Sequence, residues 1–213
     1  MNKMNNRYDM LSFIQEEIKP LISAEIGVFK GEYSEQILHY MPQTDIVLVD
    51  VWKHQKESVY RDSSNLTDYK FKKVKEECRK RLKKFNTGQI FVQKDSVQAS
   101  KLYADDTFDF IYIDGNHSYE ATKADLEAWY PKLRRGGYFA GHDYDNYIGK
   151  QTTIQVKTAV LEFARANKAI VKSSGEKYPF SPSWYFKKGF KTLESFKDLK
   201  NPKGFLKGVG RNE

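Results

Sequence analysis

The 213-residue sequence lacks several features that define common classes of protein. It contains one cysteine, Cys78, so no intrachain disulfide can form. Its longest stretches without Asp, Glu, Lys or Arg have only nine residues, whereas a membrane-spanning helix needs about 20 apolar residues. The basic start, residues 1–7, is not followed by the apolar run of a signal peptide, because Asp9 and Glu16 interrupt it. We therefore expect a soluble, cytoplasmic protein without a membrane partner.

The composition is that of a globular protein with an uneven charge. Hydrophobic residues make up 39% of the chain and 13 glycines add to them, which excludes a disordered or collagen-like chain. The net charge of +8 is concentrated in two segments: 53–84 has 12 basic and 5 acidic residues, and 187–213 has 8 basic and 3 acidic ones. Two interpretations stay open, a basic surface that attracts an anionic substrate or nucleic acid, and a solvated lysine-rich face.

Short apolar runs alternate with helical patterns along most of the chain. The runs predict strands at 22–26, 46–51, 90–92, 108–113 and 138–140. Amphipathic periodicity predicts helices at 32–40, 68–85, 117–133 and 152–167. Such alternation is typical of an α/β fold, in which helices cover both faces of a parallel sheet.

The pattern changes after Asn167. Residues 169–172 and 184–187 predict two strands with a short connection, which must be antiparallel. We expect a single domain over 1–190, with an N-terminal helix within 1–20 and a basic helical connection at 53–86. Residues 191–213 are expected to be a basic tail.

The ends of the predicted strands carry the candidate binding residues, because open parallel sheets bind ligands there. The first strand ends in EIGVFKG, residues 25–31, where a glycine turn lets backbone N–H groups approach a ligand. Glu25, Gly27, Val28 and Gly31 are the candidates, although two turn glycines without a ligand explain the pattern equally. Phe29 replaces the second glycine of the dinucleotide fingerprint, which argues against a nicotinamide dehydrogenase.

The next two strand ends add polar groups at suitable spacing. Asp50 lies 19 residues beyond the glycine turn, where an acidic side chain can accept hydrogen bonds from a ribose. It is followed by Val51 and Trp52, and Trp52 either covers an adenine face or packs in the core. Asp95 and Ser96 can address an adenine, or they cap a helix.

The fourth strand is followed by DGNHSYE, residues 114–120, and the fifth, after Gly136 and Gly137, by GHDYDN, residues 141–146. With the glycine turn and the acid at Asp50, this order of motifs from Ala24 to Asp143 resembles the class I S-adenosylmethionine-dependent methyltransferases. The sequence Ile-Asp-Gly-x-His-Ser-Tyr-Glu and the later Leu-Arg-x-Gly-Gly resemble the branch that methylates hydroxyls of small molecules and sugars, which includes macrocin O-methyltransferase.

This resemblance implies a Rossmann-like methyltransferase fold, a mostly parallel seven-stranded sheet with an antiparallel last strand. It implies S-adenosylmethionine as cofactor, with Asp114 beside it, and His117 as the general base; a helix cap is the alternative role of His117. Asp114 and Asp143 are candidate ligands of Mg2+ or another divalent cation, with Asp145 or Asn146 as a third ligand. Metal-dependent relatives have two consecutive acids where this chain has His142 and Asp143.

The expected acceptor is a small hydroxylated molecule, such as a sugar or a nucleotide-linked sugar whose phosphates meet the segment 53–84. A nucleic-acid methyltransferase is an alternative, but the Pro-Pro and Pro-Cys motifs of those enzymes are absent from the corresponding positions. A catalytically silent basic binding module on the same fold is a second alternative. The sequence is compatible with a homo-oligomer.

Overall fold

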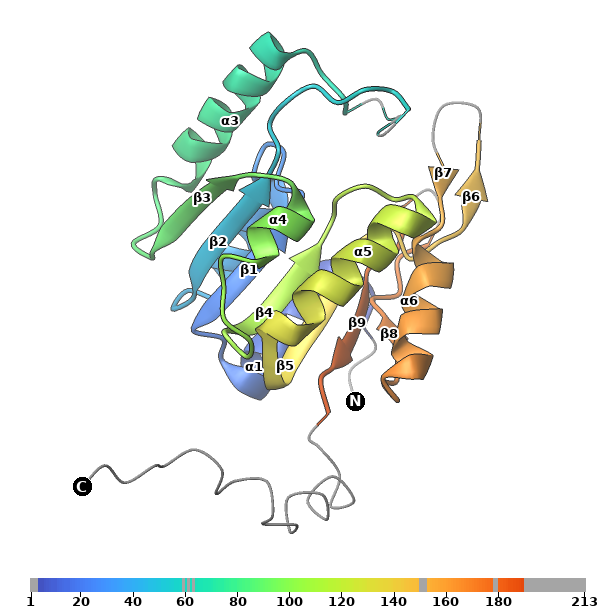
Figure 1. Ribbon diagram of the computed structural model, residues 1–213. Coiled ribbons are helices and arrows are strands. Elements are labelled where there is room, and N and C mark those ends of the chain that lie inside the picture. Colours follow the sequence, from blue (N-terminus) through green and yellow to red (C-terminus); the bar gives the residue numbers. More distant parts are fainter. Residues whose placement is uncertain are drawn as a thin grey trace, which may run out of the picture.

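The computed structural model describes residues 4–58, 60, 62, 64–149, 153–177 and 180–189 (Figure 1). Its main sheet consists of β1 (Ile22–Ile26), β2 (Asp45–Asp50), β3 (Gln89–Gln93), β4 (Phe108–Ile113), β5 (Leu133–Gly141), β8 (Lys172–Ser173) and β9 (Trp184–Lys187). The helices are α1 (Arg7–Ile18), α2 (Glu32–Tyr40), α3 (Asp68–Leu82), α4 (Ser96–Ser100), α5 (Tyr119–Trp129) and α6 (Val156–Ala166), and η1 (Tyr130–Lys132) is a 3-10 turn.

The sheet has the order β3-β2-β1-β4-β5-β9-β8. Strands β1 to β5 run parallel to their neighbours, and β9 runs antiparallel to both β5 and β8. The predicted Rossmann-like methyltransferase fold is confirmed. The chain places β2 and β3 on one side of β1 and then β4 and β5 on the other. The strand order therefore reverses between β1 and β4, which is where ligands of open parallel sheets bind.

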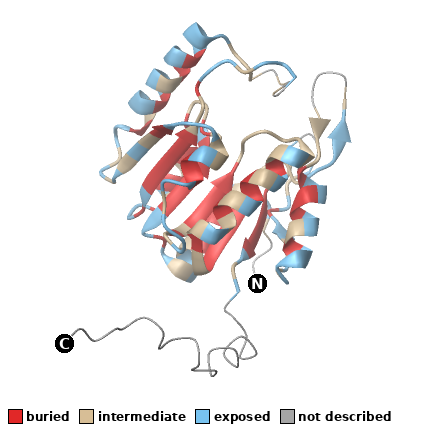
Figure 2. Cartoon of the chain, viewed as in Figure 1, coloured by how far each residue is buried: buried red, intermediate tan, exposed pale blue. Residues whose placement is uncertain are grey.

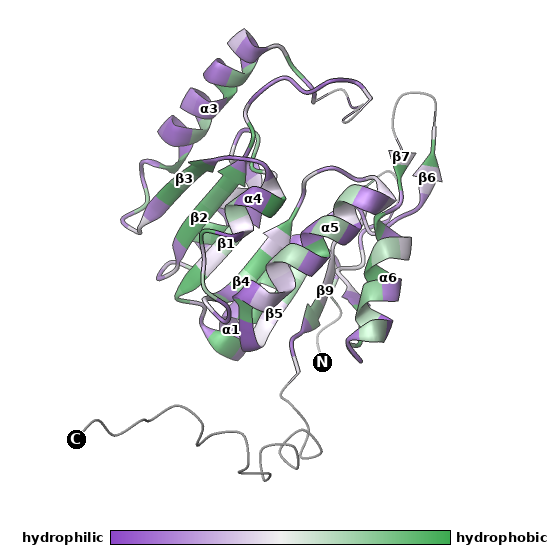
Figure 3. Cartoon of the chain, in the orientation of Figure 1, coloured by the Kyte–Doolittle hydropathy of each residue, from purple (hydrophilic) through white to green (hydrophobic). Residues whose placement is uncertain are grey.

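Alternate side chains of the strands pack into two apolar clusters, one on each face of the sheet. In β2, Ile46 and Leu48 pack with α1, α2 and α3, whereas Val47 and Val49 pack with the cluster of α4, α5 and α6. The central strands are buried (Figure 2) and strongly apolar (Figure 3). Because both faces are covered, these strands appear in the sequence as continuous apolar runs. No helix of the described segments is both long and apolar enough to cross a membrane.

The apolar runs and periodicities located β1, α2, β4 and β9 at their observed bounds. Helix α1 lies within the predicted 1–20, and α3 is the helical part of the predicted connection 53–86. The predicted tail 191–213 lies outside the described residues, as does residue 152 at the start of the predicted helix 152–167. Helix α6 begins only at Val156, because Thr153 and Ile154 form β7, which pairs with β6 (Tyr147–Ile148).

Two elements near the site were missed or shortened by the sequence prediction. Strand β5 extends from Leu133 because Gly136 and Gly137 continue it past a register shift in β4. A Cβ on Gly137 would lie 2.7 Å from the backbone oxygen of Asp109, so only glycine allows this close pairing. Helix α4 is too short to show a periodic pattern.

Candidate functional site

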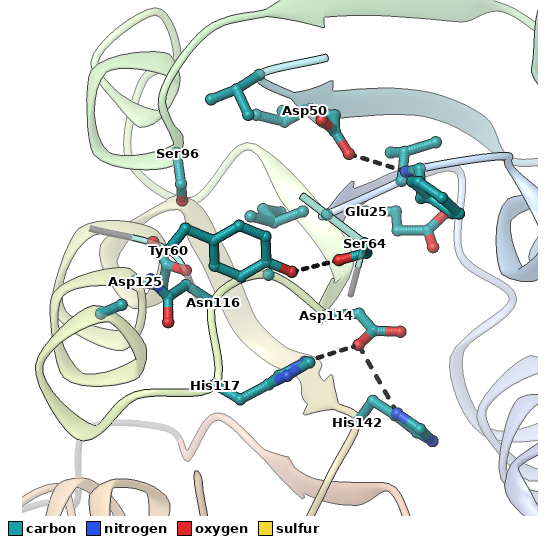
Figure 4. A pocket seen from close by; sticks show the side chains of 18 of the residues that line it. Glu25, Asp50, Tyr60, Ser64, Ser96, Asp114, Asn116, His117, Asp125 and His142 are labelled. Carbon is teal, nitrogen blue, oxygen red and sulfur yellow. Dashed lines mark hydrogen bonds and ion pairs between the residues drawn. The ribbon is translucent and has the colours of Figure 1, made fainter. Parts of the chain in front are cut away.

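A cavity of about 530 Å³ lies over the carboxyl ends of the central strands, where the strand order reverses. Its lining contains most of the predicted site residues, namely Glu25, Gly27, Val28, Asp50, Val51, Asp95, Ser96, Asp114, His117 and Asp143. Figure 4 shows the polar side chains that converge on it from β1, β2, α4, α5 and the loops that follow β2, β4 and β5. Gly31 and Trp52 do not line it.

The two glycines of the predicted turn have different roles. Gly27 has φ +90°, and a Cβ there would lie 2.0 Å from the backbone oxygen of Asp114. It therefore allows the ends of β1 and β4 to touch at the floor of the cavity. Gly31 has φ +72° at the start of α2, and its Cβ would lie 2.6 Å from the sulfur of Cys78 in α3. The prediction of Gly31 as a ligand contact is corrected: it lets α3 pack closely on α2.

Asp50 is held in the cavity by backbone hydrogen bonds. Its carboxylate accepts the N–H of Phe29 at 2.8 Å and the N–H of Trp52 at 2.7 Å. Both donors have positive φ, 49° and 37°, an uncommon conformation for side-chain-bearing residues that concentrates at functional sites. Burial raises the pKa of Asp50. Each carboxylate oxygen keeps acceptor capacity for a ligand hydroxyl.

Trp52 is a core residue, which corrects its prediction as a cofactor contact. Its side chain is buried, its indole N–H donates to the backbone oxygen of Phe29 at 2.9 Å, and its ring packs near Phe91. An aromatic group does enter the cavity from the segment after β2: the ring of Tyr60, whose hydroxyl lies 2.6 Å from the Ser64 hydroxyl (Figure 4).

Asp95 and Ser96 form the start of a helix, which was the alternative predicted for them, and both also line the cavity. Asp95 caps α4, accepting the N–H of Gln98 at 3.1 Å. The Ser96 hydroxyl accepts the indole N–H of Trp129 at 2.9 Å. Beside them lies Asp125 of α5, which no sequence motif marked, because its position within an amphipathic helix resembles that of an ordinary surface acid. It is only 6% exposed and faces the cavity.

The burial of Asp125 makes a pH-dependent contribution to stability. Burial raises its pKa to about 7, against the opposing effect of the Ser96 hydroxyl. The folded state therefore holds this proton to higher pH than the unfolded state, so the associated stability is present at low pH and is lost as the pH rises from about 4 to about 7. We expect Asp125→Asn to remove this loss, roughly 3 kcal/mol in the free energy of unfolding.

Urea unfolding between pH 4.5 and pH 8 measures this effect. The matched control is Glu127→Gln on the same helix, whose side chain is exposed and should leave the pH profile of the wild type unchanged. Parallel profiles for the wild type and Asp125→Asn would contradict the expectation.

Two histidines and two aspartates form a second polar group, which we call the His–Asp cluster: Asp114, His117, His142 and Asp143. The His117 Nε2 lies 3.4 Å from an Asp114 oxygen and 3.2 Å from an Asp143 oxygen. The His142 Nδ1 lies 3.3 Å from Asp143 and 3.7 Å from Asp114. His117 is not a helix cap, since Ser118 caps α5.

The cluster perturbs its own ionisation. Burial alone would lower the pKa of His117, but the carboxylates of Asp114 and Asp143 raise the pKa overall, and the pKa of His142 is raised in the same way. Although burial opposes it, contact with the two imidazoles lowers the pKa of Asp143 to about 2. Asp143 also has a positive φ of 49°. Closely coupled acid and base groups in a cavity are typical of catalytic sites.

Asp114, His117 and Asp143 each offer one atom to a group within 4.8 Å, which fits a divalent cation with oxygen and nitrogen ligands. The predicted third ligand is corrected. Asp145 bonds the backbone N–H of the next residue, and the Asn146 side chain accepts the N–H of Thr158 at 3.2 Å near the start of α6. Neither residue lines the cavity.

Among the described residues, the cavity has more carboxyl-bearing side chains than lysine or arginine side chains. The described part of its lining has three lysine or arginine side chains, Arg7, Lys30 and Lys94. Its carboxyl-bearing residues are Glu25, Glu32, Asp50, Asp62, Asp95, Asp114, Asp125 and Asp143. Such a lining attracts a positively charged ligand. No lysine of the basic segment 53–84 belongs to the described lining; Lys53, Lys72 and Lys75 border a separate depression beside α3.

Glu25 is the most deeply buried of these acids. It is 1% exposed, accepts a hydrogen bond from the Ser34 hydroxyl, and its pKa is raised well above the ordinary value by burial. Glu25 was predicted for the site from the sequence. Arg7 and Tyr33 line the same cavity but were not predicted. No motif marked them, because they come from the first turns of two different helices.

Residues 24–144 match a family described as a methyltransferase domain. A comparison with curated protein sequences found no match.

Several solved structures share the fold. An O-methyltransferase from Bacillus cereus in complex with SAH is 14% identical, with a TM-score of 0.58 over 85% of this chain and 80% of that one. An O-methyltransferase family protein from Burkholderia thailandensis is 10% identical, with a TM-score of 0.59 over 87% of this chain and 56% of that one. A spermidine synthase in complex with the transition-state analogue AdoDATO is 15% identical, with a TM-score of 0.57 over 100% of this chain and 68% of that one. At such identities the likeness establishes a common fold.

Proposed function

Because the chain belongs to the methyltransferase-domain family, we propose that it transfers a methyl group from S-adenosylmethionine to a hydroxyl of a small molecule. The observation that carries the proposal is the single cavity that joins Asp50 and the glycine turn at one part to the His–Asp cluster at another. The first part suits a nucleoside and the second suits deprotonation of a hydroxyl.

The acidic lining supports a cationic methyl donor. A sulfonium carries a positive charge that ionised carboxylates of the lining, such as Asp50 and Asp114, stabilise, and the charge disappears when the methyl group leaves. Asp50 is oriented to accept hydrogen bonds from the ribose hydroxyls. Ser96 and Asp125 supply polar groups that can contact the adenine.

His117 is the proposed general base. Asp114 and Asp143 flank its Nε2, so they orient the imidazole and stabilise the imidazolium that forms when it accepts the hydroxyl proton. The oxygen then attacks the methyl carbon while the carbon–sulfur bond breaks, and its electron pair goes to the neutral thioether. Positioning of oxygen, carbon and sulfur in line supplies much of the remaining rate enhancement.

We place sugars and nucleotide-linked sugars among the candidate acceptors because of the family resemblance. Since no α3 lysine lines the cavity and Lys72 and Lys75 border another depression, phosphates of such an acceptor would contact residues at the rim of the cavity and not the α3 lysines. The assembled His–Asp cluster supports an enzyme over a silent binding module. A nucleic-acid substrate stays the less favoured alternative, because the acidic cavity would repel a phosphate backbone.

A thermal-shift panel tests the cofactor. We expect saturating S-adenosylmethionine and S-adenosylhomocysteine to raise the Tm by about 5–10 °C, since a ligand at 100 times its Kd adds about 2.7 kcal/mol. NAD is the control and should give no shift, because Phe29 disrupts the dinucleotide turn. A shift with NAD alone would overturn the proposed function.

As the alternative role of the same cluster, we propose that Asp114, His117 and Asp143 bind a divalent cation such as Mg2+, with His117 as a metal ligand in place of the base. When bound, the ion would lower the pKa of the acceptor hydroxyl and so assist its deprotonation. The donor set fits, as two hard carboxylate oxygens and an imidazole lie within reach of one centre.

Addition of Mg2+ or Mn2+ to the protein saturated with S-adenosylhomocysteine is expected to raise the Tm by several degrees. Asp143→Asn should abolish this shift, and asparagine tolerates the left-handed backbone at this position. Asp145→Asn is the matched control: it lies two residues away, outside the group of three, and should keep the shift. A Tm that does not respond to either ion would leave the cluster as a metal-free base.

A further inference from the structure

Arg7 brings a positive charge into this acidic cavity from the N-terminal helix. Helix α1 has 12 residues and is about 18 Å long, and β1, which follows a short connection, spans about 17 Å. The strand runs back alongside the helix over a similar length, so the first residue of α1 lies at the carboxyl end of β1. There Arg7 lines the cavity.

The start of α1 is fixed by several contacts. The Asn6 side chain accepts the N–H groups of Tyr8 and Asp9 at 2.9 and 3.0 Å. The N–H of Arg7 donates to the carboxylate of Glu176 at 2.5 Å. A Cβ on Gly175 would lie 2.5 Å from the backbone oxygen of Met4, so the loop after β8 holds the start of the helix closely. The helix start is thereby anchored to the body of the domain.

The guanidinium of Arg7 has no carboxylate partner within 4 Å in the described part of the chain. It lies over the ring of Tyr33, 5.0 Å from the centroid, and over that of Tyr8 at 5.6 Å. The faces of these aromatic rings stabilise its charge in part, and beside a side-chain hydrogen bond with Tyr8 the guanidinium fork keeps further N–H donors for a ligand. An arginine fork of this kind matches the two oxygens of a carboxylate.

Tyr33 offers a second donor at the same place. It is only 6% exposed, lines the cavity, and packs against Tyr112 with ring centroids 4.0 Å apart. Its hydroxyl lies near that of Tyr112, yet it makes no hydrogen bond of normal geometry within the described residues. A buried hydroxyl without a partner costs free energy unless a ligand completes its hydrogen bonding.

We propose that Arg7 and Tyr33 form a subsite for a carboxylate group of a ligand bound in the cavity, with the Arg7 guanidinium and the Tyr33 hydroxyl as donors. The identity of the ligand rests on the proposed function. The amino-acid end of the cofactor is the favoured source, because Glu25 lines the same cavity and can accept a hydrogen bond from the adjacent ammonium group. The alternative source of the carboxylate group is an acidic methyl acceptor.

Calorimetric binding of S-adenosylhomocysteine and of 5′-methylthioadenosine, which lacks the amino-acid end, tests the subsite. Arg7→Gln is expected to weaken S-adenosylhomocysteine at least ten-fold and 5′-methylthioadenosine less than two-fold, since a hydrogen bond to a charged group is lost. Tyr33→Phe should weaken S-adenosylhomocysteine several-fold while it keeps the packed ring. Arg165→Gln in α6 is the control and should change neither Kd, because Arg165 is exposed and outside the lining.

The other outcomes separate the sources. A second assay adds glucuronate or glucose to the protein saturated with S-adenosylhomocysteine and measures the Tm. If Arg7→Gln leaves both Kd values unchanged but removes a Tm shift that glucuronate gives and glucose does not, the carboxylate belongs to the acceptor. If none of these measurements responds to Arg7→Gln, or if both nucleosides weaken equally, the subsite is overturned. A wild-type protein that binds neither nucleoside would instead overturn the proposed function. The Tm of each free variant reports whether it is folded.

Discussion

Replacement of His117 by alanine is expected to lower kcat about 10²–10⁴-fold, the usual contribution of general acid–base catalysis. His117 is the member of the His–Asp cluster whose Nε2 lies near both carboxylates, and it lines the cavity. Because His117 is not among the groups proposed to hold the nucleoside or its amino-acid end, the Kd of S-adenosylhomocysteine should change little. Steady-state methyl transfer to a hydroxylated acceptor measures kcat, and calorimetry measures the Kd.

His39→Ala is the matched control, since this exposed histidine lies at the end of α2, outside the cavity lining. It should retain the turnover of the wild type. Unchanged turnover in His117→Ala would exclude His117 both as a base and as an essential metal ligand. A loss of turnover agrees with either role, and the two are distinguished by whether Mg2+ or Mn2+ raises the Tm of the wild type but not that of Asp143→Asn.

Replacement of Gly27 by alanine is expected to destabilise the fold by about 3 kcal/mol or more and to remove cofactor binding. The new Cβ would lie 2.0 Å from the backbone oxygen of Asp114 and 2.7 Å from the backbone nitrogen of Gly115. Both contacts are with backbone, so no side chain can move to relieve them. The φ of +90° adds strain for any residue with a Cβ.

Urea unfolding and the Tm measure this loss. Gly189→Ala is the control, because a Cβ at this position would have no heavy atom within 4 Å and the φ is not in the positive range. It should be as stable as the wild type. A Gly27→Ala protein with wild-type stability and an unchanged Kd for S-adenosylhomocysteine would contradict the close contact of β1 and β4.

Most of the fold could be located from the sequence because burial leaves a local signature. Strand β4 lies between β1 and β5 and is covered on both faces, so its residues form an uninterrupted apolar run. Helix α2 was found through its periodic apolar face. Strand β5 was shortened in the prediction, because Gly136 and Gly137 carry no side chain that marks a strand.

The candidate site was predictable where its residues follow strand ends. Asp50, Asp114 and Asp143 each follow an apolar run, and parallel strands bring such ends to one edge of the sheet. Gly31 and Trp52 satisfy the same pattern, yet they pack against neighbouring elements. Their orientation depends on the position of α3 and on the turn after β2, which no local pattern specifies.

Local sequence was sufficient for the order of strands and helices, the parallel sheet and the strand ends that meet at the cavity, because hydrophobic periodicity and turn residues act over a few positions along the chain. The addition of Arg7, Tyr33 and Asp125 to this site was decided by the packing of the folded chain. Their side chains reach it from three helices whose packing depends on contacts between segments distant in sequence. The raised pKa of Asp125 results from burial, and the Tyr33 hydroxyl is buried without a hydrogen-bond partner in the described chain. Both properties arise only when those segments meet.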